Sequence, residues 1–138
     1  ELIQLPRTRA GLFSPDKRYL AYHIRNQADR ADNGLWLLDL QSADLEPEPL
    51  PFFGAYRWRD DVHLVYIPFD PEAAGLIFYE YNVSTGRSRP LFPKDGKRLK
   101  LSIANNEWQL SPDGSKIALL AANGTSLDGI WLIELGGR

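Results

Sequence analysis

The side chains able to act as nucleophiles or as general acids and bases are few. The 138-residue chain has two His and no Cys, which excludes thiol catalysis, thiolate metal sites and disulfides. His23 and His63 could pair with Ser14, Ser111 or Asp61 in a Ser–His–Asp arrangement. No Gly-x-Ser-x-Gly elbow is present, and both His fall in or beside short apolar runs, where packing or a turn hydrogen bond explains them. We therefore predict no catalytic residue.

Carboxylates could instead bind Ca²⁺ or carry acid–base chemistry. The candidates occupy turns of a repeat described below, which favours a turn-forming role: Asp16, Asp60, Asp61 and Asp113. The polar segment 27–34 resembles a Ca²⁺ loop, but Ala31 takes the place of a ligand, so it fails the EF-hand pattern. We read it as a hairpin loop, and we predict no metal and no cofactor.

One stretch mixes aromatic side chains with both signs of charge, as protein- and sugar-binding surfaces do. A plain strand and turn is the alternative interpretation of the same residues. The predicted binding residues are Arg57, Trp58, Arg59, Asp60, Asp61 and His63.

The elements that must position these side chains come from a repeat. Segments 12–22 and 109–119 each place a bulky apolar residue before Ser-Pro-Asp, a short polar turn and an apolar run, and segment 56–66 is a degenerate copy one residue shorter. A second motif follows each copy, at 34–40, 75–81 and 129–135: a Gly, four large apolar residues, then an acidic residue and an apolar one, with Asp39, Glu80 and Glu134 at the acidic position. Repeats of this length are typical of β-propeller blades.

The apolar runs are short, rich in Leu, Ile, Val and aromatic residues, and punctuated by Pro and Gly, which predicts strands rather than helices. We expect an all-β fold of about three four-stranded antiparallel blades in one propeller segment, at residues 8–53, 54–93 and 102–135. Pro47, Pro49 and Pro51 weaken the outer strand expected at 48–53, which only a sheet edge tolerates. The third blade lacks an outer strand, which residues 1–5 could supply.

The repeat resembles that of the TolB-like (WD40-like, PD40) propeller family. The matching segments are Ser14–Lys17, Trp36–Leu40, Ser84–Gly86, Ser111–Gly114 and Trp131–Leu135. The resemblance covers almost the whole chain and implies a propeller fold, as found in periplasmic TolB and in the propeller domains of prolyl oligopeptidase relatives. The second copy departs from the pattern by lacking Ser-Pro, and the first has Lys17 where the family has Gly.

Composition narrows the function classes. The net charge of −2 argues against a nucleic-acid partner. No apolar run approaches the ~18 residues of a membrane span. The absence of Met indicates a processed form or a piece of a longer protein. Three blades are fewer than the usual 4–8 of a propeller and leave apolar faces exposed, so we expect a protein partner or self-association, such as a dimer that completes a six-bladed ring.

The functional expectation is a non-catalytic β-propeller scaffold for protein or ligand binding in an exported bacterial protein, periplasmic or extracellular. The alternatives are the propeller portion of a hydrolase or lyase, similar to the gating domain of prolyl oligopeptidase, and a sugar-binding propeller.

Overall fold

The computed structural model describes Leu2, Gln4 and residues 8–25, 33–122, 124 and 126–136. Throughout this part of the chain the fold is all-β, with antiparallel strands and no helix. The chain divides into two compact units, Glu1–Phe53 and Gly54–Arg138.

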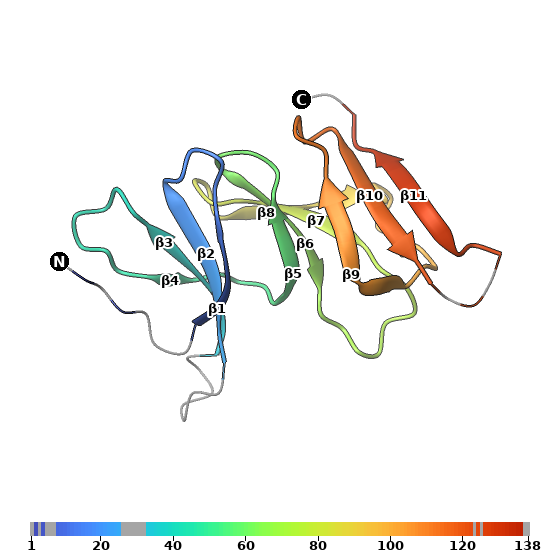
Figure 1. Ribbon diagram of the computed structural model, residues 1–138, viewed down its shortest axis with the longest axis horizontal. Helices are drawn as coiled ribbons and strands as arrows, with labels where there is room; N and C mark the ends of the chain where they lie inside the picture. The colour runs from blue at the N-terminus through green and yellow to red at the C-terminus, as the bar shows by residue number, and fades with distance from the viewer. Residues whose placement is uncertain are drawn as a thin grey trace. The chain divides into compact units, whose positions relative to one another are not determined.

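Each strand is short and belongs to one of three antiparallel sheets (Figure 1). The first sheet, in the first unit, has the order β1-β2-β3-β4, and the second unit holds the sheets β5-β6-β7-β8 and β11-β10-β9. The strands are β1 (Thr8–Phe13), β2 (Tyr19–Ile24), β3 (Gly34–Asp39), β4 (Glu48–Pro49), β5 (Gly54–Trp58), β6 (His63–Pro68), β7 (Phe78–Asn82), β8 (Arg87–Phe92), β9 (Ile103–Leu110), β10 (Lys116–Ala121) and β11 (Gly129–Glu134).

Ser-Pro-Asp makes the turn between the first two strands of the first and third sheets. The Ser14 hydroxyl accepts the Tyr19 N–H at 2.9 Å and donates to Asp16, whose carboxylate also accepts the Arg18 N–H at 3.0 Å. Ser111 and Asp113 repeat this arrangement with the N–H groups of Lys116 and Ser115. The carboxylates of Asp16 and Asp113 therefore serve the turn, as their position in the repeat predicts.

The fourth position of this turn lies in the left-handed region of backbone conformation. Gly114 has φ +69° there, and Lys17 has φ +63° at the equivalent place in the first sheet. The replacement of Gly by Lys17 therefore leaves the turn unchanged in type, at the steric cost that a side chain brings to this region.

The turn of the second sheet is one residue shorter and has no Ser-Pro. The Asp60 carboxylate, instead of a Ser hydroxyl, accepts its backbone N–H groups. The Arg59 N–H donates to the His63 carbonyl at 2.8 Å, which closes the turn. The Asp60 carboxylate accepts the N–H groups of Val62 and His63, at 3.0 and 2.8 Å.

Several predicted strand bounds need correction. The outer strand expected at 48–53 is only Glu48–Pro49, although the Leu50 N–H still donates to the Leu35 carbonyl at 2.8 Å. In the motif at 75–81 the apolar run starts at Leu76, which predicts a strand from there, but β7 begins at Phe78 because Leu76 instead pairs with Leu99.

Two predictions fall on segments that the structure describes only in part. Leu2 and Gln4 are not in a strand, and residues 1, 3 and 5 lie outside the described residues. The loop prediction at 27–34 also lies outside them, apart from Asn33 and Gly34. Within the described residues the third sheet has three strands.

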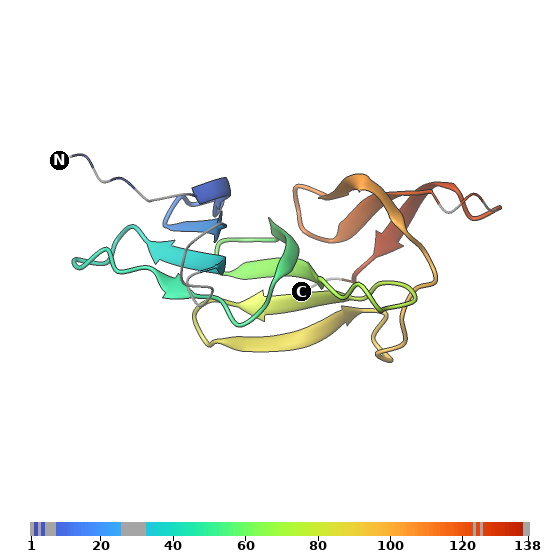
Figure 2. The same ribbon diagram turned by 90° about the horizontal axis from the view of Figure 1, so that it is seen from below.

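The core of the second unit lies between its two sheets (Figure 2). Phe78 of β7 meets Trp108 of β9 edge to face, with ring centroids 5.4 Å apart. Such pairs contribute about 1 kcal/mol beyond the burial of their area. The buried members of this core are Val65, Leu76, Phe78, Leu91, Leu101, Trp108, Ile117, Leu119, Ala121, Ile133 and Leu135.

Candidate binding surface

The structure distributes the predicted binding stretch over several environments. Arg57 lies over the Trp108 ring, 4.8 Å from its centroid, and its Nη1 donates to the Tyr56 carbonyl at 2.7 Å. Burial lowers the pKa of the Arg57 guanidinium, because charge is less stable away from water. Arg57 therefore contributes to the packing between the second and third sheets.

Arg59 is buried in an ion network that crosses from the second sheet to the third. Its Nη1 contacts Glu80 Oε2 at 2.6 Å, and its Nε donates to the Gly114 carbonyl at 2.7 Å. Arg89 binds the other oxygen of Glu80, with Nη2 at 2.8 Å and Nε at 3.1 Å. A Cβ on Gly114 would stand 2.9 Å from the Arg59 carbonyl oxygen, so this glycine is needed for the close approach.

His63 lies in a hydrogen-bonded row with Asp60 and Asn82. Its Nδ1 is 2.8 Å from Asp60 Oδ1, and its Nε2 is 3.1 Å from Asn82 Nδ2. The side-chain oxygen Oδ1 of Asn82 already accepts the N–H groups of Ser84 and Thr85, so the side-chain NH₂ of Asn82 donates to His63 Nε2. The proton of the neutral ring is therefore on Nδ1, and the row holds the turn in place.

The remaining members of the stretch are Asp61, which is exposed, and Trp58, which is half-buried. The structure thus brings Asp60 and His63 together, while Arg57 and Arg59 serve the packing with the third sheet. A binding role for these residues stays a prediction. Among the described residues, no cluster of three or more His, Cys, Asp or Glu could hold a metal ion.

A surface that the sequence did not single out lies on the third sheet. The third strands of the three sheets can be aligned, because the first residue after each of them donates its N–H to the carbonyl of the residue just before the second strand. Leu40 N donates to Arg18 O, Val83 N to Val62 O and Leu135 N to Ser115 O, at 2.8, 2.9 and 2.8 Å. Counting back from these bonds makes Leu35, Phe78 and Ile130 equivalent, and likewise Leu37, Glu80 and Leu132. The second copy of the motif is therefore shifted by two residues from its sequence alignment, and Asn82 rather than Glu80 is equivalent to Asp39 and Glu134.

The equivalent side chains differ sharply in exposure. Phe78 is 0% and Glu80 2% exposed, whereas Ile130 is 77% and Leu132 69% exposed. Leu35 and Leu37 in the first sheet are buried as well. Leu120 and Ala118 of β10 pair with Ile130 and Leu132, so they share their face of the sheet. We call these four residues, Ala118, Leu120, Ile130 and Leu132, the bare face.

A groove of about 410 Å³ borders β11. Trp131, which is partly exposed, is held there by a 2.7 Å hydrogen bond from its Nε1 to the Leu127 carbonyl. The apolar part of the lining comprises Phe92, Leu99, Leu101, Leu127, Trp131, Leu132 and Ile133.

Sequence reasoning missed the bare face because the three copies of the Gly-plus-apolar motif are about equally apolar. Only the packing of the neighbouring sheets determines which copy is covered. No protein-family model matches the chain, and no curated protein matches it. In the described residues, no helix has the length and apolar character needed to cross a membrane.

Proposed function

We propose that this chain is a non-catalytic β-propeller scaffold that binds protein partners through the bare face of its third sheet. The three sheets correspond to three blades of the TolB-like kind, in an exported protein. The observation that supports the proposal is the exposure of Ile130 and Leu132, whose equivalents in the other two sheets are buried. Exposed apolar patches of this kind mark interaction sites.

The packing inside the second unit indicates what chemistry fits the bare face. There, the face that carries Phe78 is covered by Ile117 and Leu119, with Trp108 against its ring. Another sheet of the same repeat would cover Ile130 and Leu132 in the same manner.

The occupant that we propose is a second copy of the chain. Its first sheet carries the exposed Phe13 and the half-buried Leu20 at the positions equivalent to Leu110 and Ile117, while Tyr22 and Leu38 of the same face are already buried. Burial of the exposed parts of Ile130 and Leu132 contributes about 2–4 kcal/mol, which offsets part of the entropic cost of association. Two copies joined in this way supply six sheets, the number of an ordinary propeller.

Light scattering coupled to size-exclusion chromatography tests this proposal. We expect the wild-type chain to have twice the monomer mass and a thermal unfolding midpoint that rises with protein concentration. The double variant Leu120→Lys/Leu132→Lys should elute as a folded monomer whose midpoint does not depend on concentration. Phe69→Lys is the matched control, because Phe69 is exposed to the same degree but lies outside the bare face. A wild-type monomer across the concentration range, or a double variant that still dimerises, would overturn the proposal.

A further inference from the structure

The free edge of β11 presents backbone groups as well as side chains. Along an antiparallel strand, the N–H and C=O of alternate residues point to opposite sides. The Leu135 N–H donates to the carbonyl of Ser115, the residue just before β10. The backbone N–H and C=O groups of Trp131 and Ile133 therefore also point to β10. Those of Ile130, Leu132 and Glu134 point to the other side, where no described strand pairs with β11 (Figures 1 and 2).

The first and second sheets show what occupies this edge. Pro49 of β4 lies opposite Trp36, and Pro90 of β8 lies opposite Tyr79. Trp36 and Tyr79 are the equivalents of Trp131. In both sheets the residue after the proline is a buried leucine, Leu50 in the first and Leu91 in the second.

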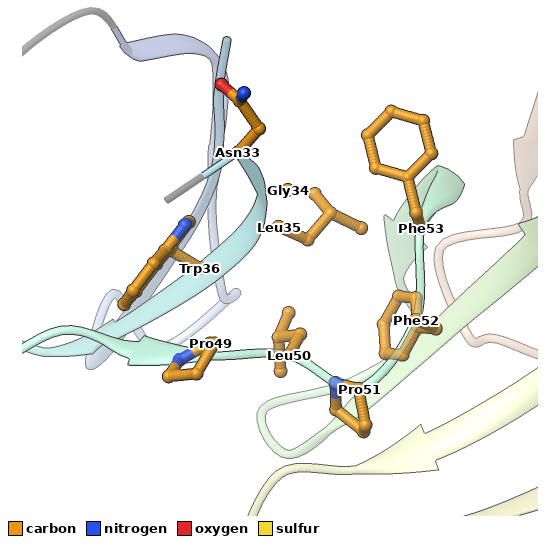
Figure 3. Close-up of a pocket in the computed structure, with 9 residues that line it drawn as sticks. All are labelled: Asn33, Gly34, Leu35, Trp36, Pro49, Leu50, Pro51, Phe52 and Phe53. Carbon is orange, nitrogen blue, oxygen red and sulfur yellow. The ribbon is translucent and has the colours of Figure 1, made fainter. Parts of the chain in front are cut away.

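The position of the proline follows from the direction of the backbone groups. The Leu50 N–H donates to the Leu35 carbonyl at 2.8 Å, so the N–H groups of alternate residues point to β3. The nitrogen of Pro49 lies between them and points away, so its missing N–H costs no hydrogen bond. Figure 3 shows Leu50 extending toward Leu35 while Trp36 lies on the other side of β3.

We propose that the free edge of β11 binds an extended peptide segment that contains a Pro-Leu step. The proline lies opposite Trp131 and enters the apolar groove beside it. The leucine lies on the opposite side of the added strand, next to Ile130. Main-chain hydrogen bonds to Ile130, Leu132 and Glu134 provide the affinity, as in other cases of strand addition to a sheet edge.

Charge further defines the segment. Glu134 is equivalent to Asn82, which lies opposite Arg87 of β8, three residues before Pro90. A basic residue three positions before the proline would therefore lie opposite the exposed Glu134 carboxylate. Opposite charges in such a cross-strand position are favourable.

This inference goes beyond the proposed function, because strand addition uses the edge of β11 and association uses the face of the sheet. The experiment uses the Leu120→Lys variant at concentrations at which light scattering shows it to be a monomer. Its substitution lies on the central strand β10 and leaves the backbone groups of the β11 edge in place. Peptide binding can therefore succeed or fail independently of self-association.

The probe is a fluorescein-labelled synthetic peptide with the sequence of residues 86–93, titrated by fluorescence polarisation. In the folded chain, Arg89 lies opposite Glu80, whose backbone groups point to β8, so the Arg89 N–H points to β7. N-methylation at Arg89 of the peptide therefore removes an N–H that would point to β11. N-methylation at its Ser88 alters an N–H that points away and is the matched control. We expect saturable binding, a loss of about tenfold or more with the first peptide, and little change with the second.

A charge exchange between the protein and the peptide tests the register of the added strand against β11. Glu134→Lys should weaken binding of the parent peptide about two- to fivefold, and an Arg87→Glu peptide should recover the loss. Trp131→Ala should weaken both peptides. Absence of saturable binding, or equal affinity of the two N-methylated peptides, would overturn the proposal.

Discussion

Strands β7 and β11 hold the same place in their sheets and have opposite surroundings. Phe78 and Glu80 of β7 are covered, and β8 pairs with the strand's outer edge. Ile130 and Leu132 of β11 are mostly exposed, and no described strand pairs with the outer edge. The comparison shows that the repeat determines where a side chain points, while the neighbouring elements determine whether it is buried.

At one pair of equivalent positions, the buried strand β7 carries the polar side chain and the exposed strand β11 carries the apolar one. The covered strand carries a carboxylate, Glu80, at the position where the bare strand carries Leu132. Glu80 is accommodated because Arg59 and Arg89 bind its two oxygens, and Arg59 continues to the Gly114 carbonyl in the turn of the third sheet. The charged position thus joins the two sheets of the unit.

The largest expected effect comes from truncating the equivalent apolar side chains. Phe78→Ala leaves a cavity beside Trp108 and should lower the free energy of unfolding by about 3–5 kcal/mol. Ile130→Ala removes an exposed side chain and should change it by less than about 0.5 kcal/mol in the monomeric background. Urea unfolding of Leu120→Lys with and without each substitution measures both values. Similar losses for the two variants would mean that Ile130 is covered in solution.

A second prediction transfers the residue of β11 into β7. Glu80→Leu leaves the buried Arg59 without its carboxylate and should cost about 3 kcal/mol in urea unfolding. The double variant Arg59→Ser/Glu80→Leu copies the residues that the first sheet has at these positions, Ser14 and Leu37. It should be more stable than Glu80→Leu alone, because no uncompensated charge is buried. A double variant no more stable than the single one would contradict this account of the network.

Local turn chemistry explains what could be predicted from the sequence. Ser-Pro-Asp predicts the turns before β2 and β10, because the Ser and Asp side chains bond backbone groups a few residues away. The short outer strand at Glu48–Pro49 and the later start of β7 were missed, since both depend on which N–H groups find a partner across the sheet.

The candidate surface could not be predicted for a related reason. Arg59 reads as an exposed charge until Glu80 and Gly114, far along the chain, are brought beside it. Ile130 and Leu132 read as core residues, because their motif matches the buried copies at Leu35 and Phe78. Burial here depends on long-range packing rather than on local pattern.

The smallest expected effect concerns the turns that precede β6 and β10, and it depends on pH. Hydrogen bonds from the Ser111 hydroxyl, the Ser115 N–H and the Ser115 hydroxyl lower the pKa of Asp113 from 3.8 to about 2. Because this pKa is lower in the folded state, the carboxylate stabilises the fold above about pH 4, and the contribution disappears as the pH falls toward 2. The second sheet has no Ser at this place in its turn, so Asp60 binds backbone groups and His63 instead.

Urea unfolding at several pH values between 7 and 2 measures this contribution. Asp113→Asn should be slightly less stable than the wild-type chain at pH 7, and the difference should narrow as the pH falls below about 4. Ser111→Ala, which removes the largest cause of the shift, should reduce the pH dependence without abolishing it. A difference between Asp113→Asn and wild type that stays constant down to pH 2 would show that the Asp113 charge does not stabilise this turn. The two turns would then differ in their side chains but not in their response to acid.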